Sequence, residues 1–382
     1  MTTPATISEL TRWTARLHEF MVQTRAVPLP EYDGFQLQFE APFNKLALDL
    51  YALQTRLNPA YAAWAHQRCP HPPFSWREIP AMPAAGFKEL ELSCLPPNHR
   101  STVFYSSGTT LHSPSRHFHN EDSLKTCERS LVTWFEKHLV PPGTRPRMLP
   151  LTPPPAQAPH SSLVHMMATV SEKFGSGAAS FLGRCDRPSG PWLLDLPAAL
   201  ENLNQAADQD HPVGLMGTAF NFVHLLDHLA STNTRLMLPH GSFVMETGGY
   251  KNQSRSVSKE SLHKSITDFL AIPSSRIVGE YGMSELSSQA YDLSLTQASA
   301  PVVPARRRFR FPPWVGIQVI SPEDGSALPA GQAGLLGVVD LANAWSVMAV
   351  QTEDLAARHE DGFVLLGRSA RSEPRGCSLQ TA

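Results

Sequence analysis

The sequence predicts an α/β fold with layered helices and strands, followed by a smaller β-rich unit. Apolar runs alternate with amphipathic helical patterns through the middle of the chain, an order typical of helices packed on a sheet. From Pro301 onward the apolar runs are short and divided by Pro and Gly, which indicates strands joined by turns. The chain has 382 residues, 42% of them hydrophobic, enough for a large core with more than one packing unit.

The first element expected is an amphipathic helix. Thr6 to Glu9 has the form of a capping box, with a hydroxyl N-cap and a glutamate three residues later. An apolar stripe at roughly helical spacing continues from it, made of Ile7, Leu10, Trp13, Leu17 and Phe20.

A second helix is expected after Asn120, which suits the N-cap position and is followed by two acidic residues. Its apolar stripe comprises Leu124, Cys127, Leu131, Trp134 and Phe135, and a short extended segment at 116–118 precedes it. Strands are expected at 147–151, 235–238, 277–281, 316–320 and 334–339, and a further helix at 258–270.

A hydroxyl-rich loop at 105–116, YSSGTTLHSPSR, follows an apolar run and ends in a cation. Glycine lets backbone N–H groups turn inward, hydroxyls add donors and arginine offsets negative charge, so the loop suits a phosphate. Taken alone, the same segment also fits a polar surface turn. It lacks the Gly-Lys-Ser/Thr ending and does not open directly into a helix, which argues against a P-loop NTPase.

Composition excludes several classes of protein. The formal net charge of -2 does not favour nucleic acid or an acidic membrane surface as a partner. The five cysteines are scattered without a CxxC pair, and the 16 histidines form no HExxH pattern. The chain shows no secretory leader and no apolar run of about 18 residues, so we expect a soluble, cytoplasmic protein.

Further segments combine with the loop into a recognisable order. They are 161–166 (SSLVHM), 245–251 (METGGYK), 280–289 (EYGMSELSSQ), 352–355 (TEDL), 361–363 (DGF), 367–368 (GR) and 375–379 (RGCSL). Together they resemble the acyl-protein synthetases, typified by LuxE, within the adenylate-forming superfamily. The resemblance runs from about Phe87 to the C-terminus and implies the large-domain fold of those enzymes, with layered αβ subdomains and a small β-rich subdomain.

The resemblance implies an ATP site. The phosphates are assigned to the loop, adenine to the Gly-Gly and Tyr-Gly segments, and the ribose to a carboxylate and an arginine. Without the resemblance, the same positions have ordinary explanations. Gly248 and Gly249 would form a plain turn, Glu285 would be a surface glutamate, and Asp354 and Arg368 would be turn residues. The implied residues are Ser106, Ser107, Gly108, Thr109, Thr110 and Arg116 for phosphate, Thr247, Gly248, Gly249, Tyr281 and Gly282 for adenine, and Asp354 and Arg368 for ribose.

Glu285 matches the superfamily's magnesium-binding glutamate, and carboxylate oxygen is the ligand type that Mg²⁺ prefers. An apolar pocket for the acid is expected beside the loop. Its candidate residues are His165, Gly217 and Phe220, with Met166 and Met167 equally suited to the core.

Two departures from the superfamily pattern stand out. Leu111 occupies the position of a loop glycine, which makes the loop stiffer. The chain ends shortly after Arg368, so the resemblance implies that the usual C-terminal cap domain and its catalytic lysine are absent.

Cys377 matches the cysteine that accepts the acyl group in the acyl-protein synthetases. A thiolate is a good nucleophile, and Arg371 and Arg375 are close enough in sequence to lower its pKa. The other reading is an ordinary thiol in a terminal tail. The other four cysteines fit packing roles.

The sequence therefore predicts ATP- and Mg²⁺-dependent activation of a carboxylic acid, by the resemblance a fatty acid. The acyl group would pass to Cys377 and then to an acyl-reductase or acyl-carrier partner. The alternatives are direct transfer to a carrier protein or amine, and a non-catalytic ligand-binding protein of the same fold. The expected divisions are an N-terminal part at 1–100, an α/β core at 101–300, a β-rich subdomain at 301–368 and a tail at 369–382.

Overall fold

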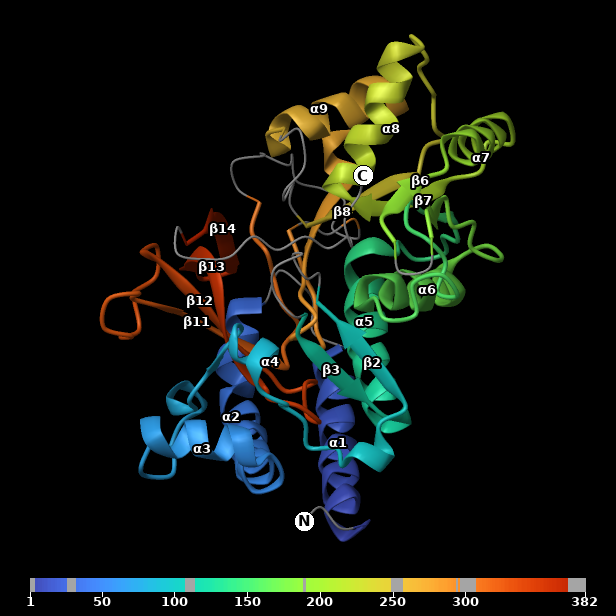
Figure 1. The fold of residues 1–382 in the computed structure, drawn as a ribbon. Helices are drawn as coiled ribbons and strands as arrows, with labels where there is room; N and C mark the ends of the chain where they lie inside the picture. Colours follow the sequence, from blue (N-terminus) through green and yellow to red (C-terminus); the bar gives the residue numbers. More distant parts are fainter. Residues whose placement is uncertain are drawn as a thin grey trace.

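The computed structural model describes residues 4–25, 32–106, 114–187, 190–248, 257–292, 295 and 307–369. Figure 1 shows α8 and α9 at one end of the molecule, the sheet of β11 to β14 at one side, and α1 to α3 at the opposite end. The N-terminal part contains α1 (Pro4–Arg25), α2 (Tyr32–Leu57), α3 (Pro59–Arg68), the 3-10 turn η2 (Trp76–Glu78), β1 (Met82–Pro83), α4 (Gly86–Glu89) and η3 (Pro97–His99).

The middle of the described chain alternates strands and helices. It contains β2 (Thr102–Tyr105), β3 (Arg116–His119), α5 (Glu121–Leu139), β4 (Arg147–Pro150), α6 (Ser162–Phe174), β5 (Gly183–Cys185), β6 (Trp192–Leu194), α7 (Leu196–Asp208), β7 (Val213–Thr218), α8 (Ala219–Ser231), β8 (Phe243–Thr247), α9 (Lys259–Leu270), η4 (Ser274–Arg276), β9 (Ile277–Tyr281) and β10 (Ala290–Tyr291). The last part contains β11 (Val315–Ile320), β12 (Ala333–Asp340), β13 (Ala349–His359) and β14 (Gly362–Arg368).

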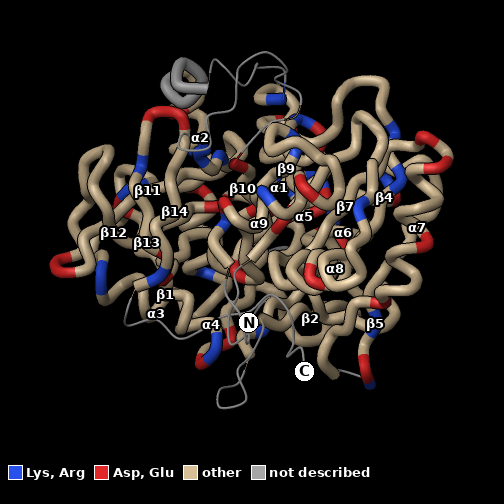
Figure 2. Tube along the Cα trace, turned by 90° about the horizontal axis from the view of Figure 1, so that it is seen from above, with Lys and Arg blue, Asp and Glu red and all other residues tan. Residues whose placement is uncertain are grey.

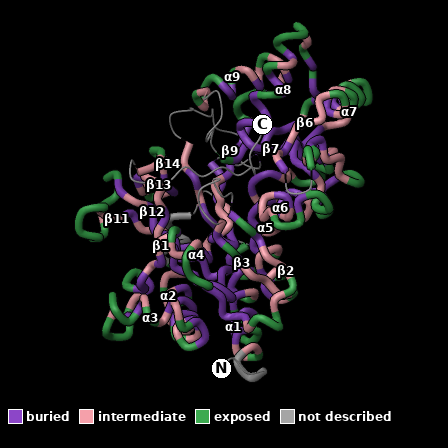
Figure 3. The backbone as a smooth tube through the Cα atoms, in the orientation of Figure 1, coloured by how far each residue is buried: buried purple, intermediate pink, exposed green. Residues whose placement is uncertain are grey.

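The central sheet has the strand order β10-β9-β8-β7-β4, with β4, β7, β8 and β9 parallel and β10 antiparallel at one edge. Successive side chains of these strands enter opposite cores: Val244 packs with α7, α8 and α9, whereas Met245 packs with α5 and α6. Helices on both faces explain why the strands are apolar throughout. Figure 3 shows these strands buried and the outer turns of α7, α8 and α9 exposed.

The β-rich sheet is built around β13, which pairs with β12, with β14 and, in parallel, with β1. β11 completes the sheet on the far side of β12. Because β1 comes from the N-terminal part, one hydrophobic core joins this sheet to α1 and α2.

Most of the predicted elements are confirmed. Leu10, Trp13, Leu17 and Phe20 are all buried on α1. The predicted helix at 258–270 is α9, capped by the Ser258 side chain. The strands expected at 147–151, 277–281, 316–320 and 334–339 are β4, β9, β11 and β12, within a residue or two at their ends.

Two predictions are wrong. α1 begins at Pro4, so Thr6 lies inside the helix instead of capping it; proline is favoured in a first turn because its φ is already helical. Residues 235–238 form no strand. The Leu236 and Leu238 N–H groups donate to the carbonyls of Phe269 and Leu270, at 2.8 and 3.3 Å. These carbonyls end α9 and have no partner within the helix, so the segment satisfies them.

Charges are dispersed over the molecule. Figure 2 shows basic and acidic residues interspersed along the described elements, as expected for a net charge near zero. Within the described residues, no helix combines the length and the apolar character that crossing a membrane requires.

Candidate active site

A cavity of about 590 Å³ lies where β8 and β9 end, at the carboxyl edge of the central sheet. Ligands of parallel α/β sheets bind at this edge because loops from several strands converge there. The cavity gathers residues that the sequence analysis assigned to different parts of one ligand. Of those, Ser106, His165, Thr247, Gly248, Tyr281, Gly282, Glu285, Asp354 and Arg368 line it.

One part of the cavity wall is a hydrogen-bonded trio of residues from two sheets. The Tyr281 hydroxyl donates to Asp354 Oδ2 at 2.8 Å, and Arg368 Nε donates to Asp354 Oδ1 at 3.1 Å. Asp354 and Arg368 are directly paired in the β13–β14 ladder, so the strand register places them together. Three residues far apart in sequence thus form one polar wall.

The β8 and β9 ends carry a buried carboxyl beside this wall. Thr247 and Glu280 are paired across the two strands, and the Thr247 hydroxyl donates to Glu280 Oε2. The pKa of the Glu280 carboxyl is raised to about 7, chiefly by burial and in smaller part by the Glu246 carboxylate, while the Thr247 bond offsets some of the rise. A Cβ on Gly282 would crowd Glu280 Oε1, so a larger residue there would displace this buried side chain.

A cluster of charged side chains, made of Lys259, Glu246 and Asp292, also lines the cavity near Glu280. Lys259 Nζ is 2.7 Å from Asp292 Oδ2 and 3.2 Å from Glu246 Oε1. Burial alone would lower the pKa of Lys259, but Glu246 and Asp292 outweigh it and raise that pKa. Asp292 also accepts the Gly279 N–H at 2.7 Å, which ties the group to β9.

Hydrogen bonds to Asp340 and Asn343 fix the loop that carries Glu285. Asp340 is fully buried and accepts from the Ser287 N–H and the Ser288 hydroxyl, each at 2.8 Å. Asn343 donates to the Glu285 carbonyl at 2.9 Å. The Glu285 side chain, only 2% exposed, is therefore presented to the cavity from a rigid loop.

The hydroxyl-rich loop begins and ends on the β2–β3 hairpin. Ser106 and Ser115 close its base, because the Ser115 N–H donates to Ser106 Oγ at 2.9 Å. The Ser115 hydroxyl also reaches Glu285 Oε1 at 3.3 Å and His117 Nε2 at 2.8 Å. The base of the loop and Glu285 therefore face each other. Ser107, Gly108, Thr109, Thr110 and Leu111 lie outside the described residues.

The opposite part of the cavity is apolar, with walls from β2, α5, α6 and the start of α8. His165 lies here on α6, with Nε2 3.1 Å from Glu128 Oε1 and its ring 5.3 Å from that of Phe104. Burial, with His117 and His165 nearby, lowers the pKa of His119 to about 3, so this ring is neutral at physiological pH. These elements contribute the apolar residues Phe104, Leu131, Leu163, Met166 and Ala219, and Leu262, Met283, Leu286, Phe309, Val364 and Leu365 also line the cavity.

Three of the predicted residues do not line this cavity. Gly217 lies inside β7, where a Cβ would be only 3.0 Å from Leu151. Phe220 is buried against His224, and its neighbour Ala219 lines the cavity instead. Arg116 is exposed on β3. Gly249 and Cys377 lie outside the described residues.

Some lining residues were missed by the sequence analysis. Glu246 and Glu280 lie inside the quoted segments 245–251 and 280–289 but were given no role, and Lys259 and Asp292 lie outside every quoted segment. Gln289 also lines the cavity, and its buried Oε1 has no hydrogen-bond partner among the described residues. Cys127 lines it too, but burial raises the pKa of its thiol to about 12, which makes it a poor nucleophile.

The fold is that of the adenylate-forming ligases. The chain is similar to an open conformation of 2-hydroxyisobutyryl-CoA ligase in complex with 2-HIB-AMP and CoA, with a TM-score of 0.59 and 13% identity over 87% of this chain and 77% of that one. The postadenylation state of the same ligase, in complex with 2-HIB-AMP, gives a TM-score of 0.59 and 13% identity over 87% of this chain and 70% of that one. ATP-bound MatB from Rhodopseudomonas palustris gives a TM-score of only 0.46 and 18% identity over 72% of this chain and 49% of that one.

The model of the acyl-protein synthetase family LuxE matches residues 46–382, so the chain belongs to this family. None of the curated proteins matches the chain. The family and the ligase fold both agree with activation of an acid through an acyl-AMP.

Proposed function

We propose that the chain uses ATP to activate a carboxylic acid as acyl-AMP and then transfers the acyl group to the thiol of Cys377. The observation that carries the first step is the gathering of Ser106, Glu285, Asp354 and Arg368 around one cavity that apolar side chains also line. A nucleotide and an aliphatic acid need such a two-part site, because one is highly charged and the other is not.

The polar end suits the nucleoside. Asp354 already accepts from Tyr281 and Arg368, but a carboxylate has about four acceptor positions, so capacity remains for ribose hydroxyls. Gly248 has a φ of 71°, which lets the backbone pass close to a flat base without a side chain. Gln289 Oε1 provides an acceptor for a ligand donor. Adenine would lie against Thr247, Gly248, Gly249, Tyr281 and Gly282.

The cavity residues could bind Mg²⁺ as nucleotide enzymes commonly do, through one carboxylate together with the phosphates and water. The described residues contain no group of three or more His, Cys, Asp or Glu side chains able to hold a metal ion by themselves. Mg²⁺ is commonly held by one or two carboxylates with phosphate and water, and Glu285 would provide that carboxylate beside the loop. When bound, the ion offsets charge on the phosphates.

In the first step, the acid's carboxylate oxygen attacks the α-phosphorus, and the bond from that phosphorus to the bridging oxygen breaks, releasing pyrophosphate. The loop hydroxyls and N–H groups stabilise the added charge. Phe104, Leu131 and Met166 exclude water from the acyl chain, which favours an aliphatic, fatty acid.

In the second step, the Cys377 thiolate attacks the acyl carbon, and the bond from that carbon to the AMP oxygen breaks. The tail that carries Cys377 follows β14, whose Gly367 and Arg368 line the cavity. Cations at Arg371 and Arg375 favour the thiolate. The thioester would then pass to an acyl-reductase or acyl-carrier partner.

The test separates the two steps. Exchange of labelled pyrophosphate into ATP, measured with a panel of fatty and aromatic acids, reports the first step. An acyl adduct that neutral hydroxylamine releases reports the second, and we expect it to be absent in Cys377→Ala while exchange persists. An adduct that survives in Cys377→Ala would overturn the second step, and absence of exchange with every acid would overturn the first.

Direct transfer to a carrier protein or an amine remains the alternative second step. It predicts full turnover of Cys377→Ala when the acceptor is supplied. The acyl-thiol adduct of the wild-type chain distinguishes it from self-acylation.

A further inference from the structure

A hydrogen-bonded chain of two buried side chains leads to Glu285 from outside the cavity. Ser115, directly before β3, and His117, on β3, are 0% and 4% exposed, and neither lines the cavity. Burying a hydroxyl and an imidazole costs free energy unless both are hydrogen bonded. The proposed function gives neither side chain a role of its own.

The alternation of side chains along β3 explains how both residues reach the same side. Successive side chains of a strand point to opposite faces, so Ser115 and His117 share one face. Arg116 and Phe118 share the other, where the Arg116 guanidinium carbon lies 5.7 Å from the centre of the Phe118 ring. The buried Phe87 ring packs against His117, with ring centres 5.4 Å apart, and restricts the imidazole to one position.

The protons of this chain can be assigned from the chemistry of its members. The Ser115 hydroxyl lies 3.3 Å from Glu285 Oε1 and 2.8 Å from His117 Nε2. A hydroxyl has one proton to donate, and a carboxylate that binds a metal is ionised and can only accept. The Ser115 hydroxyl therefore donates to Glu285, and the Nε2–H of His117 donates to Ser115 Oγ.

We propose that Ser115 and His117 are positioning residues, which orient the Glu285 carboxylate for Mg²⁺. This inference rests on the metal role proposed for Glu285. Partners that hydrogen bond a metal ligand fix its orientation, and losing one typically costs about 10–100-fold in metal affinity. A carboxylate has about four acceptor positions, so a bond from Ser115 is compatible with binding an ion.

Ser115 also ties the carboxylate to the base of the hydroxyl-rich loop. Its N–H donates to Ser106 Oγ at 2.9 Å, and its carbonyl accepts from the Ser106 N–H at 3.2 Å. Ser106 lines the cavity beside Glu285. Mg²⁺ in nucleotide sites is shared between carboxylate and phosphate, so the two must keep a fixed separation. One residue, held by His117, connects both.

The test measures Mn²⁺ binding to the full chain by electron paramagnetic resonance, with α,β-methylene-ATP present. Mn²⁺ takes the same oxygen ligands as Mg²⁺. Ser115→Ala removes the central hydroxyl, and His117→Phe keeps a ring against Phe87 but removes the donor. We expect each to weaken Mn²⁺ binding about tenfold. His117→Gln, whose amide N–H can replace the Nε2–H, should restore most of the affinity.

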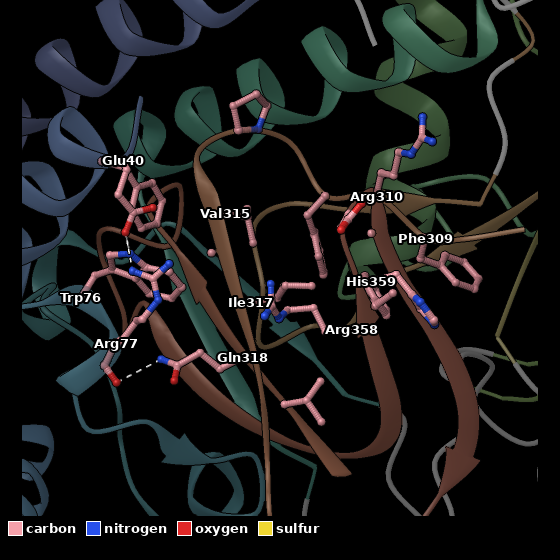
Figure 4. Close-up of a pocket in the computed structure, with 18 of the residues that line it drawn as sticks. Glu40, Trp76, Arg77, Phe309, Arg310, Val315, Ile317, Gln318, Arg358 and His359 are labelled. Atoms are coloured by element: carbon pink, nitrogen blue, oxygen red, sulfur yellow. Dashed lines mark hydrogen bonds and ion pairs between the residues drawn. The ribbon is translucent and has the colours of Figure 1, made fainter. Parts of the chain in front are cut away.

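A double variant separates positioning from general damage to the fold. If His117 acts through Ser115, the double variant Ser115→Ala, His117→Phe should bind Mn²⁺ as Ser115→Ala alone does. Gln318→Ala is the matched control. Figure 4 shows the Gln318 amide bonded to the Arg77 carbonyl, at 3.0 Å, beside a second cavity on the β-rich sheet. This control also loses one hydrogen bond and should leave Mn²⁺ binding unchanged.

The outcomes distinguish this inference from the proposed function. Wild-type Mn²⁺ affinity in Ser115→Ala, with weak binding in Glu285→Gln, would overturn the inference and leave the proposed function standing. Losses that add in the double variant would overturn the action of His117 through Ser115. Wild-type affinity in Glu285→Gln would overturn the metal role of Glu285 and this inference with it. Should His117→Phe fail to fold, Ser115→Ala and His117→Gln still decide.

Discussion

The Tyr281 hydroxyl donates a 2.8 Å hydrogen bond to Asp354 Oδ2 and so joins the last residue of β9 to the β-rich sheet. The bond is made across the cavity wall by residues from two separate sheets. It fixes the direction of the carboxylate that we assign to the ribose. Four predictions follow from this and neighbouring contacts.

Tyr281→Phe keeps the ring contacts but removes the hydrogen bond to Asp354. Because one such bond contributes about 1 kcal/mol, we expect the KM for ATP to rise about fivefold with little change in kcat. Pyrophosphate exchange at varied ATP measures it. Tyr51→Phe, on α2 outside this cavity, is the matched control. An unchanged KM for ATP would show that Asp354 does not need this bond.

Glu285→Gln removes the carboxylate from the loop between β9 and β10 but keeps its size. We expect pyrophosphate exchange to fall by about a hundredfold or more and to need more Mg²⁺, since the amide is a poorer ligand. Titration of exchange with Mg²⁺ measures both effects. Glu172→Gln, an exposed change on α6, should behave as the wild type does. A wild-type Mg²⁺ dependence in Glu285→Gln would remove Glu285 from the metal site.

Glu280→Gln should change how stability depends on pH. Burial raises the folded-state pKa of Glu280 from 4.5 to about 7. The folded chain therefore binds the proton more tightly, so this residue's contribution is fully present below pH 4.5 and is lost as the pH rises through 7. We expect the glutamine variant to gain up to about 3 kcal/mol over the wild type between pH 4.5 and pH 8.

Urea unfolding at pH 4.5 and at pH 8 measures the free energy of unfolding of the wild type and of Glu280→Gln. The same comparison with Glu172→Gln, whose carboxylate is exposed, should show no such gain. A difference that is constant across this range would mean that Glu280 titrates normally in the folded chain.

Lys259→Met should destabilise the end of the central sheet. It leaves Glu246 and Asp292, with side chains 8% and 1% exposed, without their shared cation. Removing one partner of a buried pair costs about 3–5 kcal/mol, but Lys259 is itself 41% exposed, so we expect a loss nearer 2 kcal/mol. Urea unfolding at neutral pH measures it, with Lys264→Met on the exposed face of α9 as control. Equal stability of the two variants would contradict the prediction.

Elements with a strong local signal were predicted well. The apolar spacing of α1 and α9 and the apolar runs of β9, β11 and β12 are visible in a single segment each. Residues 235–238 carry the same apolar signal, yet they satisfy the end of α9 instead of joining a sheet. Their hydrogen-bond partners, the carbonyls of Phe269 and Leu270, lie about 30 residues further along the chain. The sequence pattern of residues 235–238 therefore does not reveal this pairing.

Candidate site residues that belong to contiguous motifs were also predicted from single segments of sequence. Tyr281, Gly282 and Glu285 were recognised within one segment, whereas Lys259 and Asp292 carry no motif and matter only through each other. The sequence by itself determined the family and the α/β class, and it predicted which residues would face a nucleotide. Tertiary structure alone decided that Asp354 meets Tyr281 and that Glu280 is buried enough for its pKa to rise to about 7. Pairing, burial and exposure depend on strand register and on packing between distant segments, which composition and spacing along one chain do not specify.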